Sequence, residues 1–427
     1  MAKVVVVGGG WSGCAAAIAA RKAGAEVLLL ERTDQLLGTG LVGGIMRNNG
    51  RFTAAEEAIA LGAGELFKAC DSVARHVNVD FPGHKHATLY DVARIEPKVR
   101  GIVRDLGVDV RFETRVSDIE MEGKKITAVK GEDGEVFTGD VFVECTGTAG
   151  PQGNCLKYGN GCCMCILRCP TFGPRVSIAA KAGIKEMMGG SAVGTVGAMS
   201  GSCKLLKESL APEIVEQLDS KGVAVIPIPE ELRKKDALTF KACQQYALPD
   251  FAENVVLLDT GHAKLMTSFF PLEKLRKIPG FANARFEDPY SGGRGNSMRY
   301  LAISPRSNAL KTEGVDNLFC GGEKTGPMVG HTEAIVTGTL AGHNAVRWAL
   351  GMELLELPTS LAIGDIIAYV GEQVKKPEGL RKKYTFSGSV YFERMKQLGL
   401  YTTDVAAIRE RVRKAGLEGI FDRPLVK

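Results

Sequence analysis

The stretch KVVVVGGGWSGCAAAIAARKAGAEVLLLER, residues 3–32, decides the fold of this chain. It opens with a run of valines, Val4–Val7, which has the length of a short buried strand. Three glycines follow at the spacing G-x-G-x-x-G, and an alanine-rich segment, Cys14–Ala23, then predicts a helix that ends at Gly24. A second apolar run, Val27–Leu30, predicts the next strand. This order predicts the βαβ unit of a Rossmann-type nucleotide-binding domain.

The glycines of this unit have three separate physical tasks. Gly8 permits the tight turn, Gly10 lets a pyrophosphate approach the backbone, and Gly13 lets the helix pack closely on the strand. The phosphates would then lie at the N-terminus of the helix, where unpaired N–H groups point outward. Glu31 follows the second strand, where a carboxylate accepts hydrogen bonds from the ribose hydroxyls. We predict that these residues and the adjacent Arg32 bind a dinucleotide cofactor.

A second glycine motif lies far along the chain, in GVDNLFCGGEKTGPMVGHTEAIVTGTLAGHNAVRWAL, residues 314–350. An apolar strand, Asn317–Cys320, precedes Gly322 and Glu323, and a helix begins near Gly330. An acid after a glycine pair resembles the second FAD motif of flavoproteins, where it binds the ribityl chain. The positive N-terminus of the following helix would stabilise negative charge on the flavin.

A third motif selects FAD rather than NAD. The strand in DVFVECTGT, residues 140–148, closes on Thr146 and Gly147, like the T-x-G turn of the same flavoproteins. Three motifs in the expected order predict FAD as the cofactor. No second strand–GxGxxG–helix unit follows, so electrons could reach the flavin by a route other than a bound nicotinamide.

These patterns predict an α/β fold of the two-dinucleotide, glutathione-reductase-like type. Its FAD domain would hold the Rossmann βαβ unit and a β-meander near residues 116–138, where apolar and polar residues alternate. The predicted domains are residues 1–150 (FAD domain, first part), 151–294 (inserted α+β domain, cysteine-rich, for the substrate), 295–350 (FAD domain, second part) and 351–427 (short helical C-terminal tail).

The composition is that of a globular protein, with 45% hydrophobic and 24% charged residues. No apolar run has the length of a membrane span, and the N-terminus enters a strand rather than a signal peptide, so we expect a cytoplasmic protein with no membrane association. The net charge of +5 permits an anionic substrate without selecting nucleic acid. Nothing in the sequence indicates an oligomeric state.

Five of the eleven cysteines fall within GNCLKYGNGCCMCILRCP, residues 153–170. In a reducing compartment such a cluster favours metal or redox chemistry over structural disulfides. Glycines and a Cys-Pro exit suit an iron–sulfur cluster, although the C-x-x-C spacings of ferredoxins are absent. We predict Cys155, Cys162, Cys165 and Cys169 as metal ligands and Cys163 as a catalytic thiol. A thiol–disulfide relay with the flavin and inert packing thiols stay open as alternatives.

Other polar residues are weaker candidates. His331, at the start of the helix beside the predicted flavin, is our candidate catalytic residue because its titration range suits proton transfer; capping of the helix is the alternative. His262 and Lys264 in the predicted insert, and three arginines that could bind a carboxylate or phosphate, are equally compatible with solvated loop charges. These arginines are Arg294, Arg299 and Arg306.

Residues 321–347, GGEKTGPMVGHTEAIVTGTLAGHNAVR, resemble the C-terminal FAD signature of the glucose-inhibited division protein A family and of the folate-dependent tRNA uridine methyltransferases. With the N-terminal motif the likeness covers about half the chain. It implies an FAD enzyme with an inserted domain that acts on tRNA uridine with folate-derived one-carbon units.

The chain departs from that pattern at two places. The folate-dependent methyltransferases carry a reactive cysteine in the loop after the ribose-binding acid, but here that loop, LVGGIMRNNGRF, residues 41–52, has none. The family usually has Gly-Gln where this chain has Gly322-Glu323. With these departures, the likeness supports FAD and the architecture more than it supports tRNA as the substrate.

We therefore predict an FAD-dependent oxidoreductase that exchanges electrons through the cysteine-rich segment with a small-molecule or protein redox partner. The first alternative is a tRNA uridine-modifying flavoenzyme, as the resemblance implies. The second is a non-catalytic flavoprotein that serves as an electron-transfer or sensing subunit.

Overall fold

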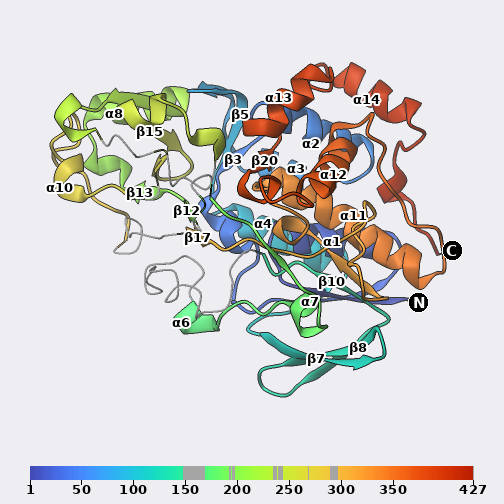
Figure 1. The fold of residues 1–427 in the computed structure, drawn as a ribbon. Helices are drawn as coiled ribbons and strands as arrows, with labels where there is room; N and C mark the ends of the chain where they lie inside the picture. Colours follow the sequence, from blue (N-terminus) through green and yellow to red (C-terminus); the bar gives the residue numbers. More distant parts are fainter. Residues whose placement is uncertain are drawn as a thin grey trace.

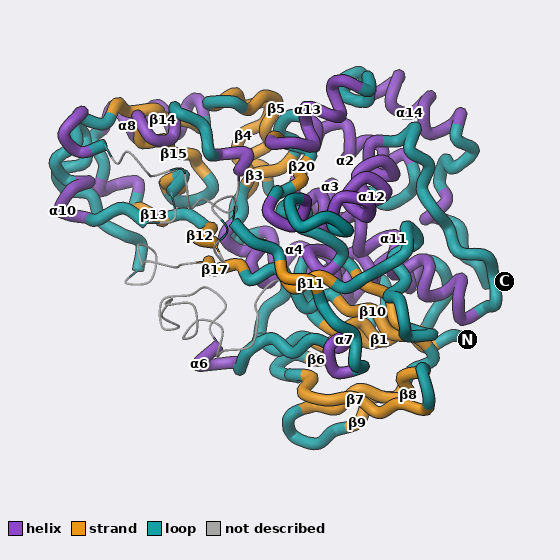
Figure 2. Tube along the Cα trace, viewed as in Figure 1, coloured by secondary structure: helices purple, strands orange, loops and turns teal. Residues whose placement is uncertain are grey.

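The computed structural model describes residues 1–147, 169–191, 194, 198–233, 238, 244–267, 269–288 and 297–426. Its centre is a five-stranded sheet in the order β19-β10-β1-β2-β6, and every neighbouring pair is parallel. Figure 2 labels three of these strands, β1, β6 and β10. The strands are β1 (Lys3–Val7), β2 (Glu26–Leu30), β6 (Asp109–Arg111), β10 (Val141–Glu144) and β19 (Leu318–Cys320). The strands expected at both glycine motifs and at the T-x-G turn are thus neighbours in one sheet.

Helix α1 (Trp11–Lys22) begins three positions earlier than the alanine-rich segment suggests. The reason is that Gly10 caps the helix and its carbonyl already accepts a hydrogen bond from Cys14 N at 2.9 Å. Gly13 therefore lies inside the first turn. The helix ends before Gly24, whose φ of +100° is the left-handed conformation that suits glycine.

The sheet is buried on both faces, so its strands read as continuous apolar runs. Val4 and Val6 belong to the core under the helices, whereas Val5 and Val7 belong to a second core on the opposite face. The helical face is covered by α1, α4 (Ile95–Asp105) and α11 (His331–Ala349).

The opposite face is covered by the expected β-meander and by the short helix α7 (Ile178–Lys181). The meander consists of β7 (Val116–Glu122), β8 (Lys125–Gly131) and β9 (Val136–Thr138), which pair antiparallel. Figure 2 labels all three strands.

A second, antiparallel sheet has the order β13-β16-β15-β14 and its own apolar core with helices α8 (Pro212–Lys221) and α10 (Leu272–Leu275). Its strands are β13 (Cys203–Leu205), β14 (Val223–Pro227), β15 (Asn254–Asp259) and β16 (Ala263–Leu265). Figure 1 shows this unit on the left, on the other side of the molecule from α1 and α11.

A third sheet, β3-β5-β4, comes from an earlier part of the chain that the sequence patterns did not reveal as strands. It contains β3 (Ile45–Met46), β4 (Ala74–Phe81) and β5 (His84–Tyr90). The β4–β5 register shifts at several points, and Asn78 has a positive φ, so the alternation of a regular strand is broken. The hairpin shares one apolar core with β15.

The C-terminal tail is helical, as predicted. It comprises α12 (Ala362–Gln373), α13 (Ser389–Gln397) and α14 (Val405–Lys414), and Gly399 with φ +65° lies just after the end of α13. These helices pack near α2 (Gly50–Ala60), where buried Glu57 accepts hydrogen bonds from Ala362 N and Ile363 N and pairs with Arg411.

The shorter described elements complete the connections. They are α3 (Glu65–Ser72), α6 (Cys169–Phe172), α9 (Asp250–Glu253), β11 (Met187–Met188), β12 (Ala198–Ser200), β17 (Ser297–Arg299), β18 (Ala302–Ile303), β20 (Tyr384–Thr385) and the 3-10 turns η1 (Gly38–Val42), η2 (Lys207–Ser209), η3 (Glu230–Leu232), η4 (Gln244–Tyr246), η5 (Gly322–Lys324), η6 (Gly379–Arg381) and η7 (Ile420–Asp422). Among the described helices, none combines the length and apolar character needed to cross a bilayer.

Candidate functional site

A cavity of about 910 Å³ opens where the parallel strands end. Val7, Leu30, Cys145 and Gly321, at or just beyond the carboxyl ends of four strands, line it. Ligands of open α/β sheets bind outside the carboxyl ends of the strands, so this is where the fold places a cofactor. The η1 turn and residues of β13 and β16 complete the walls.

The three glycines of the N-terminal motif differ in what a side chain would meet. A Cβ at Gly8, where φ is +99°, would lie 2.5 Å from Cys145 O, and one at Gly13 would lie 1.7 Å from Gly8 O. A Cβ at Gly10 would meet nothing within 4 Å, and Gly10 lines the cavity. Gly8 and Gly13 thus serve the turn and the helix packing, while Gly10 faces the open space.

Glu31 lies buried in the wall of the cavity and accepts hydrogen bonds from Gly9 N at 2.6 Å and from Thr33 N at 2.8 Å. Burial raises the pKa of Glu31 above its ordinary value, and these two hydrogen bonds oppose that rise. The neighbouring Arg32 also lines the cavity and donates to Gly173 O.

The T-x-G turn is held by a residue that sequence analysis missed. Arg175 lines the cavity and donates from Nη1 to Thr146 Oγ1 at 3.3 Å and to Gly147 O at 3.1 Å. Its side chain is 4% exposed, and its Nε finds no hydrogen-bond partner among the described atoms. No sequence motif marks Arg175 as the residue that holds this turn, because Arg175 reaches the turn only through the tertiary structure.

Behind the turn lies a buried charged cluster. Glu144 accepts hydrogen bonds from Ile178 N and Ala179 N, and Lys324 Nζ lies 3.4 Å from its Oε1 and contacts Glu186 as well. Burial alone would raise the pKa of Glu144, but the nearby Lys324 and Arg175 outweigh it and lower that pKa. The cluster anchors β10 to the C-terminal motif.

The C-terminal motif meets the same cavity. Gly322, at a φ of +66°, and Glu323 line it, and Gly322 N donates to Thr337 Oγ1 of α11 at 2.9 Å. Gly330 and His331 line it at the start of α11.

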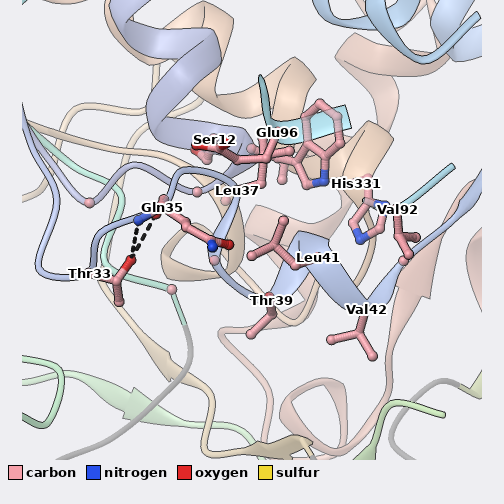
Figure 3. Close-up of a pocket in the computed structure, with 18 of the residues that line it drawn as sticks. Ser12, Thr33, Gln35, Leu37, Thr39, Leu41, Val42, Val92, Glu96 and His331 are labelled. Atoms are coloured by element: carbon pink, nitrogen blue, oxygen red, sulfur yellow. Dashed lines mark hydrogen bonds between the residues drawn. The ribbon is translucent and has the colours of Figure 1, made fainter. Parts of the chain in front are cut away.

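His331 lies among residues of the η1 turn and the β5–α4 connection, as Figure 3 shows for Leu41, Val42 and Val92. Tyr90 Oη is 3.3 Å from His331 Nδ1, and the Trp11 ring lies 5.7 Å from the imidazole, centre to centre. Burial raises the pKa of Tyr90, so its hydroxyl keeps its proton and can donate it in the hydrogen bond to His331.

The remaining candidates divide between the cavity and the core. His262 and Lys264 line the cavity from the second sheet. Arg306 instead donates to Thr325 O and Ile367 O and is buried away from the cavity lining, so its role is structural. Arg294 and the side chain of Arg299 lie outside the described residues.

Four of the predicted cysteines, Cys155, Cys162, Cys163 and Cys165, also lie outside the described residues. Cys169 begins α6. Within the part of the chain that the structure describes, no three His, Cys, Asp or Glu side chains are grouped to hold a metal ion. The iron–sulfur cluster and the catalytic thiol therefore stay predictions.

The fold resembles a solved structure over nearly its whole length. GidA from Aquifex aeolicus, in its form II crystal, matches with a TM-score of 0.65 at 17% identity, covering 97% of this chain and 76% of that one. At this identity the match shows the fold.

Two relatives match over shorter stretches. The methylenetetrahydrofolate–tRNA-(uracil-5-)-methyltransferase TrmFO of Lactobacillus delbrueckii subsp. bulgaricus is 36% identical over 97 residues, which are 22% of this chain and 20% of the relative. The tRNA uridine 5-carboxymethylaminomethyl modification enzyme MnmG of Chlorobaculum tepidum is 31% identical over 133 residues, 30% of this chain and 20% of the relative. The matches thus span about a fifth of each relative.

The family model described as glucose inhibited division protein A matches residues 3–209 and 233–353. This match covers both parts of the central sheet, both glycine motifs, the T-x-G turn and most of the second sheet. The chain therefore belongs to the glucose-inhibited division protein A family and has the FAD-binding Rossmann-type fold of that family.

Proposed function

We propose that this protein is an FAD-dependent enzyme that modifies tRNA. The observation that carries the proposal is that both glycine motifs and the T-x-G turn line one cavity, which residues of the second sheet also line. TrmFO and MnmG are named for reactions on tRNA uridines, and this likeness favours tRNA modification over electron transfer through the cysteine-rich segment.

The residues that line the cavity suit FAD. Gly10 and the N-terminus of α1 would receive the pyrophosphate, because a ligand can approach the Gly10 backbone without meeting a side chain. Glu31, with Arg32 beside it, would bind the ribose of the adenosine, and Glu323 would bind the ribityl chain. Further contacts would come from Thr146, Gly147, Gly322 and Gly330.

FAD would supply redox chemistry at this site, and the chain would supply proton transfer and positioning. We assign the Tyr90 hydroxyl as the donor to Nδ1 of His331, 3.3 Å away, and in that tautomer Nε2 is the imidazole nitrogen that carries the proton. His331 at the start of α11 is thus the group we propose to hold and deliver a proton.

The first test is cofactor identity. Protein denatured after purification should release about one FAD per chain, measured by absorbance and chromatography. Release of NAD alone, or no flavin binding after reconstitution, would contradict the proposed cofactor.

The second test is the substrate. Nucleoside analysis by mass spectrometry should find one modified uridine missing from the tRNA of cells that lack the gene, and restored by the intact gene. Binding of the purified protein to tRNA should weaken steeply with salt, because phosphate contacts release counterions. An unchanged set of tRNA nucleosides would overturn the proposal.

One observation keeps electron transfer through the cysteines as a second candidate. Thr146 and Gly147 line the cavity before the cysteine-rich segment, and Phe172, Pro174 and Arg175 line it afterwards. Iron and acid-labile sulfide in anaerobically purified protein, lost in Cys165→Ser with FAD retained, would support it. Wild-type protein that contains neither would exclude the iron–sulfur form.

A further inference from the structure

Two lysines face each other on the wall that the second sheet contributes to the cavity. Strands β13 and β16 pair antiparallel with Lys204 opposite Lys264. Residues in register on neighbouring strands project from the same face of the sheet, and both lysines line the cavity. Like charges directly opposite each other destabilise a sheet, so folding alone does not favour this pair.

The hydrogen bonds described for Lys264 hold its ammonium group in place through neutral oxygens. Its side chain is buried, and Nζ donates to Ser202 Oγ at 2.9 Å and to Val42 O in the η1 turn. These two bonds fix the position of the ammonium group on the wall of the cavity. The contact with Val42 also places the charge beside the turn that lines the cofactor part of the cavity.

Lys204 is more accessible, and it has no salt-bridge partner among the residues that the structure describes. Glu287 places a carboxylate beside His262 in the cavity lining; its side chain is 40% exposed and its Oε2 lies 3.7 Å from His262 Nδ1. Water screens a half-exposed carboxylate, so Glu287 offsets little of the positive charge.

His262 adds a neutral hydrogen-bonding group to the same wall. Burial, with help from Lys204 and Lys264, lowers the pKa of His262 to about 3. The imidazole is therefore uncharged at neutral pH and can donate or accept a hydrogen bond without repelling either lysine.

We propose that Lys204 and Lys264 bind an anionic group of the substrate, a phosphate or a carboxylate, on the wall formed by β13 and β16. The inference rests on the proposed function in one respect, because it takes this cavity as the place where substrate and FAD meet. It adds an anion site separate from the one at the N-terminus of α1, which the pyrophosphate would use. Two ammonium point charges suit an oxyanion without demanding the planar geometry that arginine selects.

The test uses the full chain saturated with FAD, so that the pyrophosphate site is occupied. Inorganic phosphate, uridine 5′-monophosphate and succinate are titrated separately by calorimetry. The variants are K204Q, K264Q and the conservative K204R, with K277Q as the matched control, since Lys277 is exposed and outside the cavity lining.

We expect K204Q to weaken binding of the preferred anion by about tenfold or more, K204R to restore most of it, and K277Q to leave it within about twofold. K264Q also removes the contact with η1 and can lower stability, so K204Q carries the test. Phosphates binding better than succinate would identify a phosphate group, and the reverse a carboxylate.

Equal binding by wild-type protein and K204Q would overturn the inference, as would the absence of saturable binding of all three anions. FAD content is measured in every variant. A protein that binds no FAD contradicts the proposed function, yet the difference between wild type and K204Q still reports on the lysine pair.

Discussion

At the scale of single residues, Glu31 is a buried carboxylate whose direction is set by the protein itself. Its oxygens already accept hydrogen bonds from Gly9 N and Thr33 N, so the carboxylate is fixed in direction before a ligand arrives. A fixed acceptor loses little conformational entropy on binding, which favours affinity.

We predict that Glu31→Ala weakens FAD binding by about 1.5–3 kcal/mol, the range for a hydrogen bond to a charged group. Fluorescence titration of the refolded apoprotein measures the change. Glu135→Ala, in an exposed turn of the meander, is the control and should bind FAD like wild type. Equal affinities for the two variants would show that Glu31 only stabilises the turn.

His343 is a buried imidazole whose two nitrogens have no hydrogen-bond partner among the described atoms. Burial lowers its pKa to about 4, from an unfolded value near 6.5. Because the folded pKa is the lower one, the unfolded chain binds the proton first, and stability falls as pH drops from about 6.5 towards 4.

We therefore predict that His343→Leu removes this loss of stability. The wild type should lose up to about 1.4 kcal/mol per pH unit from this residue between pH 6.5 and 4, and the variant should not. Urea unfolding of both proteins at pH 7 and pH 5 measures the difference. The same pH dependence in both proteins would contradict the assignment.

At the scale of elements, helices α1 and α11 can pack this closely because α11 carries glycines, which have no side chain, at the contact. A Cβ at Gly338 would lie 2.1 Å from Ser12 O, and one at Gly342 would lie 2.1 Å from Ala16 O. Both obstacles are backbone atoms of α1, which move only if the helices separate. Since Ser12 and Gly322 line the cavity at this contact, separation would also disturb the site.

We predict that Gly342→Ala lowers the free energy of unfolding by about 1–3 kcal/mol, the usual cost of overpacking. Gly101→Ala is the matched control, because Gly101 also lies inside a helix, α4, but its Cβ would meet nothing within 4 Å. That variant should gain about 0.5–1 kcal/mol, as alanine in a helix does relative to glycine. Equal effects in chemical denaturation would refute the packing argument.

At the scale of the whole molecule, the described lining of the cavity lacks the reactive thiol that the folate route requires. The loop of residues 41–52 contains no cysteine, and Cys145 is the one cysteine among the described residues that line the cavity. Burial raises the pKa of Cys145 to about 12, so its thiol stays protonated and is a poor nucleophile.

We therefore predict that the purified protein does not transfer a methyl group from methylenetetrahydrofolate to tRNA uridine. Incubation with labelled folate, FAD, a reductant and unmodified tRNA should leave the tRNA unlabelled, while an authentic TrmFO in the same mixture labels it. Stoichiometric labelling by this protein would overturn the prediction and direct attention to the cysteines of residues 155–165.

The nucleotide-binding core could be predicted from the sequence because the residues that determine it are neighbours in the chain. The motif is contiguous in the chain: it consists of Val4–Val7, the three glycines, the alanine-rich helix and Glu31. Each residue type in it suits the backbone conformation at its own position. The second glycine motif and the meander are equally local, so their strands and helix were predicted close to the positions observed.

Only the tertiary structure decided what surrounds that core. Arg175 reaches the T-x-G turn, Tyr90 reaches His331, and Lys204 comes to face Lys264, although in each pair the two residues lie far apart in the chain. The hairpin β4–β5 escaped prediction because bulges break its alternation, and its core forms only against β15. Local sequence patterns therefore indicate which cofactor the chain binds. The side chains that would contact a substrate come together only when distant segments pack against each other, and no local pattern encodes that packing.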